Sequence, residues 1–130
     1  MPMGDIRFER EDKIVVAVLT GEVDLSNAAS VRHHIAESVT PGDDALLVDL
    51  SELSFIDSAG LHMLIELGTV LDERRQHLLL CVTHGSPIER AIEIIGLSRS
   101  VSIHAERGEA MQAARTSAME SRPISPNEDA

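Results

Sequence analysis

Short apolar runs alternate with segments of helical period through the second half of this sequence. Two runs have the apolar composition of buried strands, residues 45–50 and 77–82, and the alternation of Val101 and Ile103 predicts a short last strand. Three segments repeat apolar side chains at the spacing of an amphipathic helix: residues 58–75, 86–95 and 108–119. This alternation builds a parallel sheet with helices packed on it, so an α/β protein is predicted.

The first half of the chain adds two strands. Ile6 and Phe8 alternate with charged residues and predict an edge strand over residues 5–11. Residues 14–19 form an apolar run continuous enough for a central strand covered on both faces, after which the chain is expected to leave the sheet. A tight acidic turn joins the two strands and makes them antiparallel. We therefore predict a mixed sheet of about five strands with about four helices.

Capping and breaking residues mark the helix boundaries. Ser26-Asn27 is expected to open a helix that stops before Pro41-Gly42. Its inward-facing positions are Ala28, Val31 and Ile35. Ser86-Pro87-Ile88-Glu89 has the pattern of a capping box with proline at the first helical position, and Gly96 supplies the C-terminal stop. The core face of that helix is expected to comprise Ile88, Ala91, Ile92 and Ile95.

Length and composition indicate one domain over residues 1–119. The remaining residues 120–130 contain two prolines and little to bury, so we expect a disordered tail. The N-terminal residues have no apolar segment typical of a signal peptide, so none is expected, and the longest apolar run, IVVAVL, is far too short to span a membrane. The single cysteine, Cys81, lies in a predicted strand and is interpreted as a buried apolar residue in a reducing compartment. A cytoplasmic protein is expected.

Charge and aromatic content argue against nucleic acid and membrane surfaces as partners. The formal net charge is −11, which repels phosphate backbones and anionic lipids. Aromatic residues make up only 2% of the chain, so base stacking on aromatic platforms is nearly excluded.

The candidate functional residues lie where the helix of residues 58–75 begins. Leu61, Leu64, Ile65 and Leu71 are expected to mark the inward face of this helix. Either Asp57 or Ser58 falls at its N-cap, with Gly60 inside the first turn, where backbone N–H groups lack helical partners. Ser58 is therefore either a cap or a hydroxyl placed where a phosphate is electrostatically favoured.

A hydrolase site, a metal site and a phosphate-binding loop find little support in the sequence. His62 lies four residues after Ser58, but the pair projects outward side by side and no G-x-S-x-G motif is present. His33 and His34 point to different faces of a helix and cannot chelate together, and His77, His84 and His104 have no metal-ligand spacing. Phosphate-loop motifs are missing. We expect a protein without enzymatic activity, metal or cofactor.

Three sequence patches resemble the STAS domain of bacterial anti-sigma factor antagonists. Residues 50–61, LSELSFIDSAGL, are similar to the family signature. Thr20-Gly21-Glu22-Val23-Asp24 resembles a second characteristic patch, and Ile95-Gly96-Leu97 a third. Their order and spacing match the family, and they sit in a domain spanning most of residues 5–118.

The resemblance implies a partner-switching protein. Such an antagonist binds an anti-sigma factor that is also a serine kinase, which frees the sigma factor for transcription. Phosphorylation of the serine that follows the aspartate, here Ser58, separates the two, and a serine phosphatase reverses the change. By the same resemblance Asp57 and Gly60 shape the helix start, and Glu22 and Asp24 lie in a neighbouring loop that contacts the kinase.

Two positions depart from the family pattern within the expected partner-binding segment. Ala59 stands where many members have a second serine, which leaves Ser58 as the only hydroxyl at the helix start. His62 replaces a small residue, and is interpreted as a solvated surface histidine, as a group that crowds the partner, or as a source of pH sensitivity.

Two other functions stay open at this point. One is a STAS adaptor subunit of a lipid-transport ATPase or of a stress-signalling complex, in which Ser58 is structural. The other is a weak nucleotide-binding or hydrolytic protein. Oligomeric state is not predicted.

Overall fold

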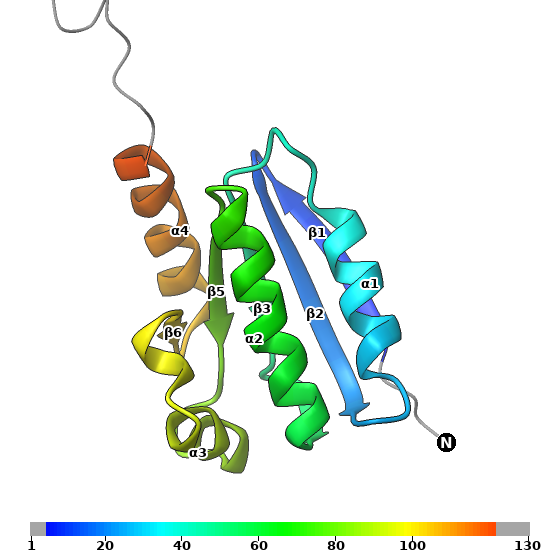
Figure 1. The fold of residues 1–130 in the computed structure, drawn as a ribbon. Helices are drawn as coiled ribbons and strands as arrows, with labels where there is room; N and C mark the ends of the chain where they lie inside the picture. The colour runs from blue at the N-terminus through cyan, green and yellow to red at the C-terminus, as the bar shows by residue number, and fades with distance from the viewer. Residues whose placement is uncertain (1–4, 122–130) are drawn as a thin grey trace, which may run out of the picture.

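The computed structural model describes residues 5–121, which form a mixed sheet flanked by four helices (Figure 1). The strands are β1 (Asp5–Glu11), β2 (Ile14–Val23), β3 (Ala45–Asp49), β4 (Leu53–Ile56), β5 (His77–Cys81) and β6 (Ser102–His104). The helices are α1 (Ala28–Ser38), α2 (Ser58–Glu73), α3 (Pro87–Ile94) and α4 (Arg107–Ser121), with a short 3-10 turn, η1 (Leu97–Arg99), after α3. None of these helices is long and apolar enough to cross a lipid bilayer.

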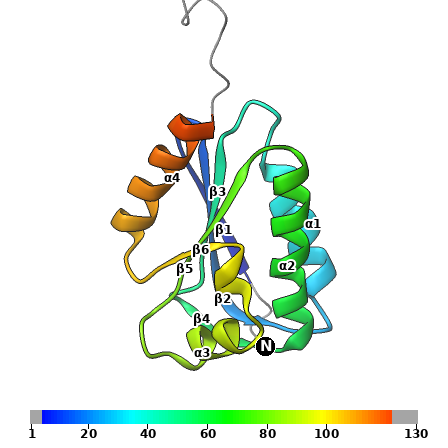
Figure 2. The same cartoon turned by 60° about the vertical axis from the view of Figure 1, so that its left-hand side comes forward.

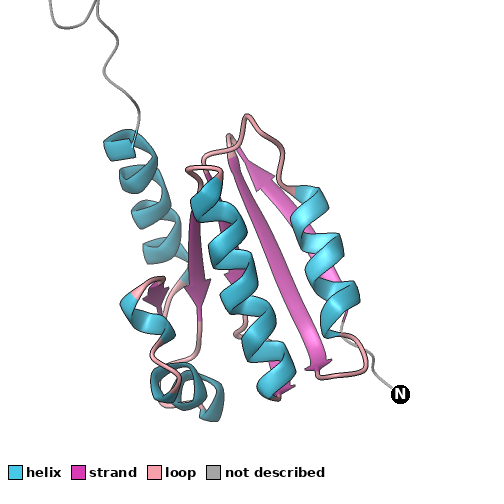
Figure 3. Cartoon of the chain, in the orientation of Figure 1, coloured by secondary structure: helices cyan, strands magenta, loops and turns pink. Residues whose placement is uncertain are grey.

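The predicted alternation of strands and helices is confirmed. The main sheet has the order β1-β2-β3-β5-β6 (Figure 3). The β1–β2 pair is antiparallel, and the β2–β3, β3–β5 and β5–β6 pairs are parallel. The sheet is mixed because the first two strands form a hairpin and every later connection crosses over through a helix or a loop.

Helices cover both faces of the sheet, as Figure 2 shows with α1 and α2 on one side and α4 on the other. Alternate side chains of β2 enter different cores, since successive residues of a strand face opposite sides. Val15, Ala17 and Leu19 pack in the larger cluster with α1 and α2. Ile14 and Val16 pack in the smaller cluster that includes residues of α4. The expectation of a central strand buried on both faces is therefore confirmed.

The end of β2 differs from the prediction. The strand does not stop at Leu19 but continues to Val23, and its last residues pair with an additional parallel strand, β4. The polar composition of residues 51–54 predicts a simple link, whereas the structure starts β4 at Leu53. A register shift between Gly21 and Glu22 allows this change of partner, and Gly21 has φ +78°, which favours glycine.

Helix boundaries agree closely with the predictions, with a few corrections. Helix α2 ends at Glu73 rather than near Arg75, and the buried stripe of α2 includes Met63 and Leu67. Ile65 and Ile95 are predicted to face the core, but each is 40% exposed: Ile65 lies outside the buried stripe of α2, and Ile95 is the C-cap residue beyond the end of α3. Helix α4 includes residues 120 and 121; the rest of the expected tail lies outside the described residues.

Candidate functional site

The predicted site forms where the end of β2 meets the start of α2. The shift at Gly21 turns the end of β2 toward β4, so Glu22 pairs with Phe55 and Val23 with Ile56. The Ser54 hydroxyl donates a hydrogen bond of 2.7 Å to the Gly21 carbonyl. Two segments far apart in sequence, residues 21–27 and 53–62, are thereby held side by side.

Asp57 is the residue that joins these two segments. Its Oδ1 accepts a hydrogen bond of 3.0 Å from the backbone N–H of Gly60, which makes Asp57 the N-cap of α2. Its Oδ2 accepts one of 3.1 Å from the backbone N–H of Leu25, and its own N–H donates to the Val23 carbonyl at 3.2 Å. One carboxylate thus fixes both the helix start and the neighbouring loop.

Ser58 is consequently not the cap. It is the first residue of α2 and is exposed. Within the part of the chain that the structure describes, its hydroxyl makes no hydrogen bond with another side chain or the backbone. The choice that the sequence leaves open is resolved: Asp57 caps the helix, and Ser58 presents an unengaged hydroxyl next to it.

Glu22 lies near the end of β2 rather than in the loop where it is expected, because β2 continues to Val23. The loop that follows, with Asp24, is ordered by polar side chains. Buried Asn27 donates from Nδ2 to the Glu22 carbonyl at 2.8 Å and accepts from the Asp24 N–H at 2.9 Å. The Asp24 carboxylate accepts hydrogen bonds from the hydroxyl and the backbone N–H of Ser26. These bonds lower the pKa of Asp24, so the group carries its negative charge at neutral pH.

Ala59 and Gly60 face inward. Ala59 is half-buried and packs against the larger core, and Gly60 is buried. A methyl group at Gly60 would lie 2.5 Å from Cγ1 of Ile56 and 3.0 Å from the Val23 carbonyl oxygen. These two residues therefore position the helix start, while Ser58 and His62 face solvent.

His62 lies one turn after Ser58 on the exposed face of α2. Its Nδ1 is 3.3 Å from Oε1 of Glu66, an atom that Nε of Arg32 on α1 approaches to 3.9 Å. The hydrogen bonds of the described residues include none between Ser58 and His62. The pair therefore lacks the nucleophile–base contact that marks a serine hydrolase.

Two exposed apolar side chains lie in the two segments that form this site, and neither is among the site residues predicted from the sequence. Leu25 is 82% exposed and follows Asp24 in the loop that Asp57 holds. Phe55 on β4 is 48% exposed. Leu25 could have been found as the one apolar residue in a polar loop, and Phe55 by its position just before the Asp57-Ser58 pair. Large exposed apolar groups beside a polar cluster are typical of protein-binding surfaces.

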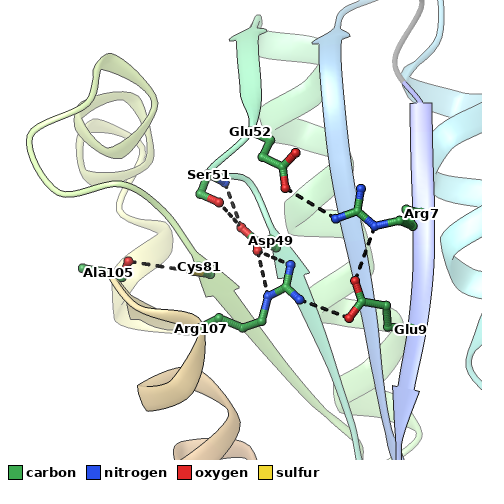
Figure 4. Close-up of polar contacts among 8 residues, drawn as sticks. All are labelled: Arg7, Glu9, Asp49, Ser51, Glu52, Cys81, Ala105 and Arg107. Carbon is green, nitrogen blue, oxygen red and sulfur yellow. Dashed lines mark hydrogen bonds and ion pairs between the residues drawn. The ribbon is translucent and has the colours of Figure 1, made fainter.

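An ion pair between buried Asp49 and partly exposed Arg107 joins β3 to the start of α4 (Figure 4). Asp49, at the end of β3, is only 3% exposed and accepts hydrogen bonds from Arg107 at 2.8 and 3.1 Å. It also accepts from the backbone N–H and hydroxyl of Ser51. Burial by itself would raise the pKa of Asp49, but the bonds from Ser51 and Arg107 outweigh it and lower that pKa. Arg107 also contacts Glu9 at 3.1 Å.

Cys81 lies beside this ion pair at the end of β5 and is buried, as predicted. Burial, followed by the negative charge of Asp49, raises the pKa of its thiol to about 11. Its Sγ donates to the Ala105 carbonyl at 3.8 Å. The thiol therefore stays protonated and serves as a packing group.

Metal ligands do not gather in the described part of the chain: no three His, Cys, Asp or Glu side chains there are placed to hold an ion. His33 and His84 instead contact the carboxylates of Glu37 and Glu89.

Comparisons with known proteins identify relatives of this fold and sequence. The family model described as STAS domain matches residues 5–110. The anti-sigma-F factor antagonist RsfB of Mycobacterium tuberculosis is 31% identical over 102 residues, covering 77% of this chain and 82% of RsfB. An anti-sigma factor antagonist structure from Mycobacterium paratuberculosis superposes with a TM-score of 0.78 at 24% identity, covering 87% of this chain and 95% of that one. The Bacillus cell fate determinant SpoIIAA in its phosphorylated form gives a TM-score of 0.63 at 22% identity, covering 85% and 100%.

Proposed function

The chain belongs to the STAS domain family, and on that premise we propose that it is an anti-sigma factor antagonist controlled by phosphorylation of Ser58. Its partner is an anti-sigma factor with serine kinase activity, and a serine phosphatase restores the unmodified form. The chain itself acts by binding, in the cytoplasm where transcription takes place. A relative at 31% identity that is named an anti-sigma-F factor antagonist supports the choice of partner class.

The observation that carries this proposal is the free hydroxyl of Ser58. Asp57 satisfies the helix cap, so Ser58 is not needed for the fold and remains exposed. Phosphorylation would form a bond between the Ser58 Oγ and the γ-phosphorus of ATP, with ADP leaving and the hydroxyl proton passing to a base of the kinase. The phosphate would sit at the N-terminal end of α2, where the helix dipole favours negative charge, so the fold can remain intact.

The same phosphate would make the surface around Ser58 unfit for its partner. The unmodified surface already carries carboxylates from Glu22, Asp24 and Asp57. A further charge of about −1.5 to −2, placed in a docked interface, adds desolvation cost and like-charge repulsion. A loss of roughly 3 kcal/mol weakens binding about a hundredfold.

The proposed partner-binding surface combines this charge with exposed apolar groups. Its exposed or half-buried members are Glu22, Asp24, Leu25, Phe55, Asp57, Ser58 and His62, and Ala59 and Gly60 support them from below. An acidic surface with apolar anchors fits a basic, partly apolar patch on the kinase.

Phosphopeptide mapping of the chain recovered from its native cells tests the proposal. We expect one phosphate on the peptide that contains Ser58, and none on a Ser58→Ala chain expressed in the same cells. Phosphate found only at other positions under conditions in which the sigma factor is inactive would contradict the proposal.

A further inference from the structure

His62 has the position and the rotational freedom to bind a phosphate carried by Ser58. We propose that phosphorylated Ser58 draws the His62 imidazolium away from Glu66 and forms an ion pair with it. This inference rests on the proposed phosphorylation of Ser58, and it adds a phosphate-binding residue to that same site.

Helix geometry places the two groups within reach of each other. Residues four apart on a helix are neighbours, with Cβ atoms roughly 5–6 Å apart. Ser58, His62 and Glu66 follow one another at this spacing, so His62 lies between the hydroxyl and the carboxylate. The His62 side chain is 70% exposed, so no packing holds the ring in its present orientation.

The present partner of His62 is a weak competitor. Its contact with Glu66 spans 3.3 Å between side chains that are 70% and 46% exposed, and surface pairs of this kind contribute little. Glu66 also has a second cation nearby, since Arg32 of α1 lies 3.9 Å from the same oxygen. Glu66 therefore keeps a partner when His62 turns toward the phosphate.

The charges around Ser58 favour this exchange. The groups on the surrounding elements are the carboxylates of Glu22 on β2, of Asp24 in the loop after it and of Asp57 at the cap, with Glu66 and Arg32 beyond His62. A phosphate on Ser58 adds to the negative charge of these carboxylates, and His62, which is cationic when protonated, lies one helix turn away. An imidazolium there offsets part of the repulsion.

The pairing has a definite effect on phosphate ionisation. A phosphoserine loses its second proton near pH 6. A nearby positive charge favours the dianion, which lowers the second pKa of the phosphate. For an exposed pair we expect this pKa to fall by roughly half a pH unit.

The test uses the full chain with phosphoserine installed at position 58 during synthesis, so that no kinase is required. The ³¹P chemical shift is followed from pH 4.5 to 8.5 in this chain and in the same chain carrying His62→Gln. A third chain, Glu66→Gln, removes the competing carboxylate as a matched control. We expect the midpoint pH of the phosphate titration to rise by roughly half a unit in His62→Gln. In Glu66→Gln this midpoint should be equal to or lower than that of the chain with both residues unchanged.

Equal phosphate midpoints with and without His62 would overturn the inference. Failure of the proposed phosphorylation in cells would leave this titration unchanged, because the phosphate is installed directly. The two proposals can therefore fail separately.

Discussion

At the scale of single residues, the contact between α2 and the end of β2 depends on Gly60 having no side chain. A methyl group at this position would lie 2.5 Å from Ile56 Cγ1 and 3.0 Å from the Val23 carbonyl, and the carbonyl belongs to backbone that cannot easily move. We expect Gly60→Ala to lower the free energy of unfolding by roughly 1–3 kcal/mol, measured by urea denaturation.

Gly68 provides the matched control for this prediction. It lies in the same helix, but a methyl group there would be 3.6 Å from Leu78 and 3.7 Å from Val101, which are ordinary contacts. Gly68→Ala should be neutral or stabilise by up to about 1 kcal/mol, because alanine favours helix. Equal destabilisation by both substitutions would contradict the close approach of α2 to the end of β2 at Gly60.

Substitutions of Asp57 and Ser58 are expected to differ in their effect on stability. Asp57→Ala removes the cap of α2 and the bond to the Leu25 N–H, so a loss of about 1–2 kcal/mol is expected. Ser58→Ala removes a hydroxyl with no hydrogen bond in the described structure, and stability should stay within about 0.5 kcal/mol. Thermal and urea unfolding of both variants measure the difference. A larger cost for Ser58→Ala than for Asp57→Ala would mean that Ser58 is the cap.

At the scale of secondary-structure elements, α4 is joined to the sheet by two arginines in different surroundings. Arg107 binds Asp49, whose side chain is nearly inaccessible, whereas Arg115 pairs with exposed Glu11. Arg107→Gln leaves a buried carboxylate short of partners and should cost roughly 1–3 kcal/mol. Arg115→Gln should cost less than about 1 kcal/mol. Urea unfolding of the two variants compares them, and similar losses would contradict the buried role of Asp49.

The lowered pKa of Asp49 also predicts a pH dependence. A carboxyl group whose pKa is lowered in the folded protein stabilises the fold at pH values above its pKa in the unfolded chain, which is near 3.9. That contribution is lost as the pH falls through the folded pKa. Asp49→Asn should therefore be less stable than the parent chain at pH 7. The difference between their free energies of unfolding should become smaller as the pH falls below about 5. Urea unfolding between pH 7 and about 2.5 measures it. A difference in stability that stays the same at every pH would contradict the lowered pKa of Asp49.

The elements themselves show what a sequence pattern can and cannot predict. β3 and β5 are predictable because a buried strand in a parallel sheet is a continuous apolar run. β4 escapes prediction because it has four residues, two of them exposed, and pairs only where Gly21 shifts the register of β2. Such pairing depends on tertiary geometry, which the periodicity of a short segment does not record.

At the scale of the whole molecule, the mixed α/β sheet follows from sequence patterns, and the meeting of both halves of the site at one end of it follows from the resemblance to the STAS family. Those patterns do not decide between Asp57 and Ser58 as the cap, because both residue types cap helices well. The decision comes from the Leu25 loop, which supplies Asp57 with a second hydrogen-bond donor. The sequence positions of Leu25 and Phe55 mark them as candidates, but how far each side chain is exposed is set by the packed fold.

The most direct test of Ser58 as the switch compares three versions of the chain as baits in native cell extract: unmodified, Ser58→Ala, and phosphoserine at position 58. Retained proteins are identified by mass spectrometry, and their affinities are then measured with purified partner. We expect the first two baits to retain the same anti-sigma factor kinase and the phosphorylated bait to bind it about a hundredfold more weakly. If all three baits retain the same proteins with equal affinity, Ser58 is not the switch.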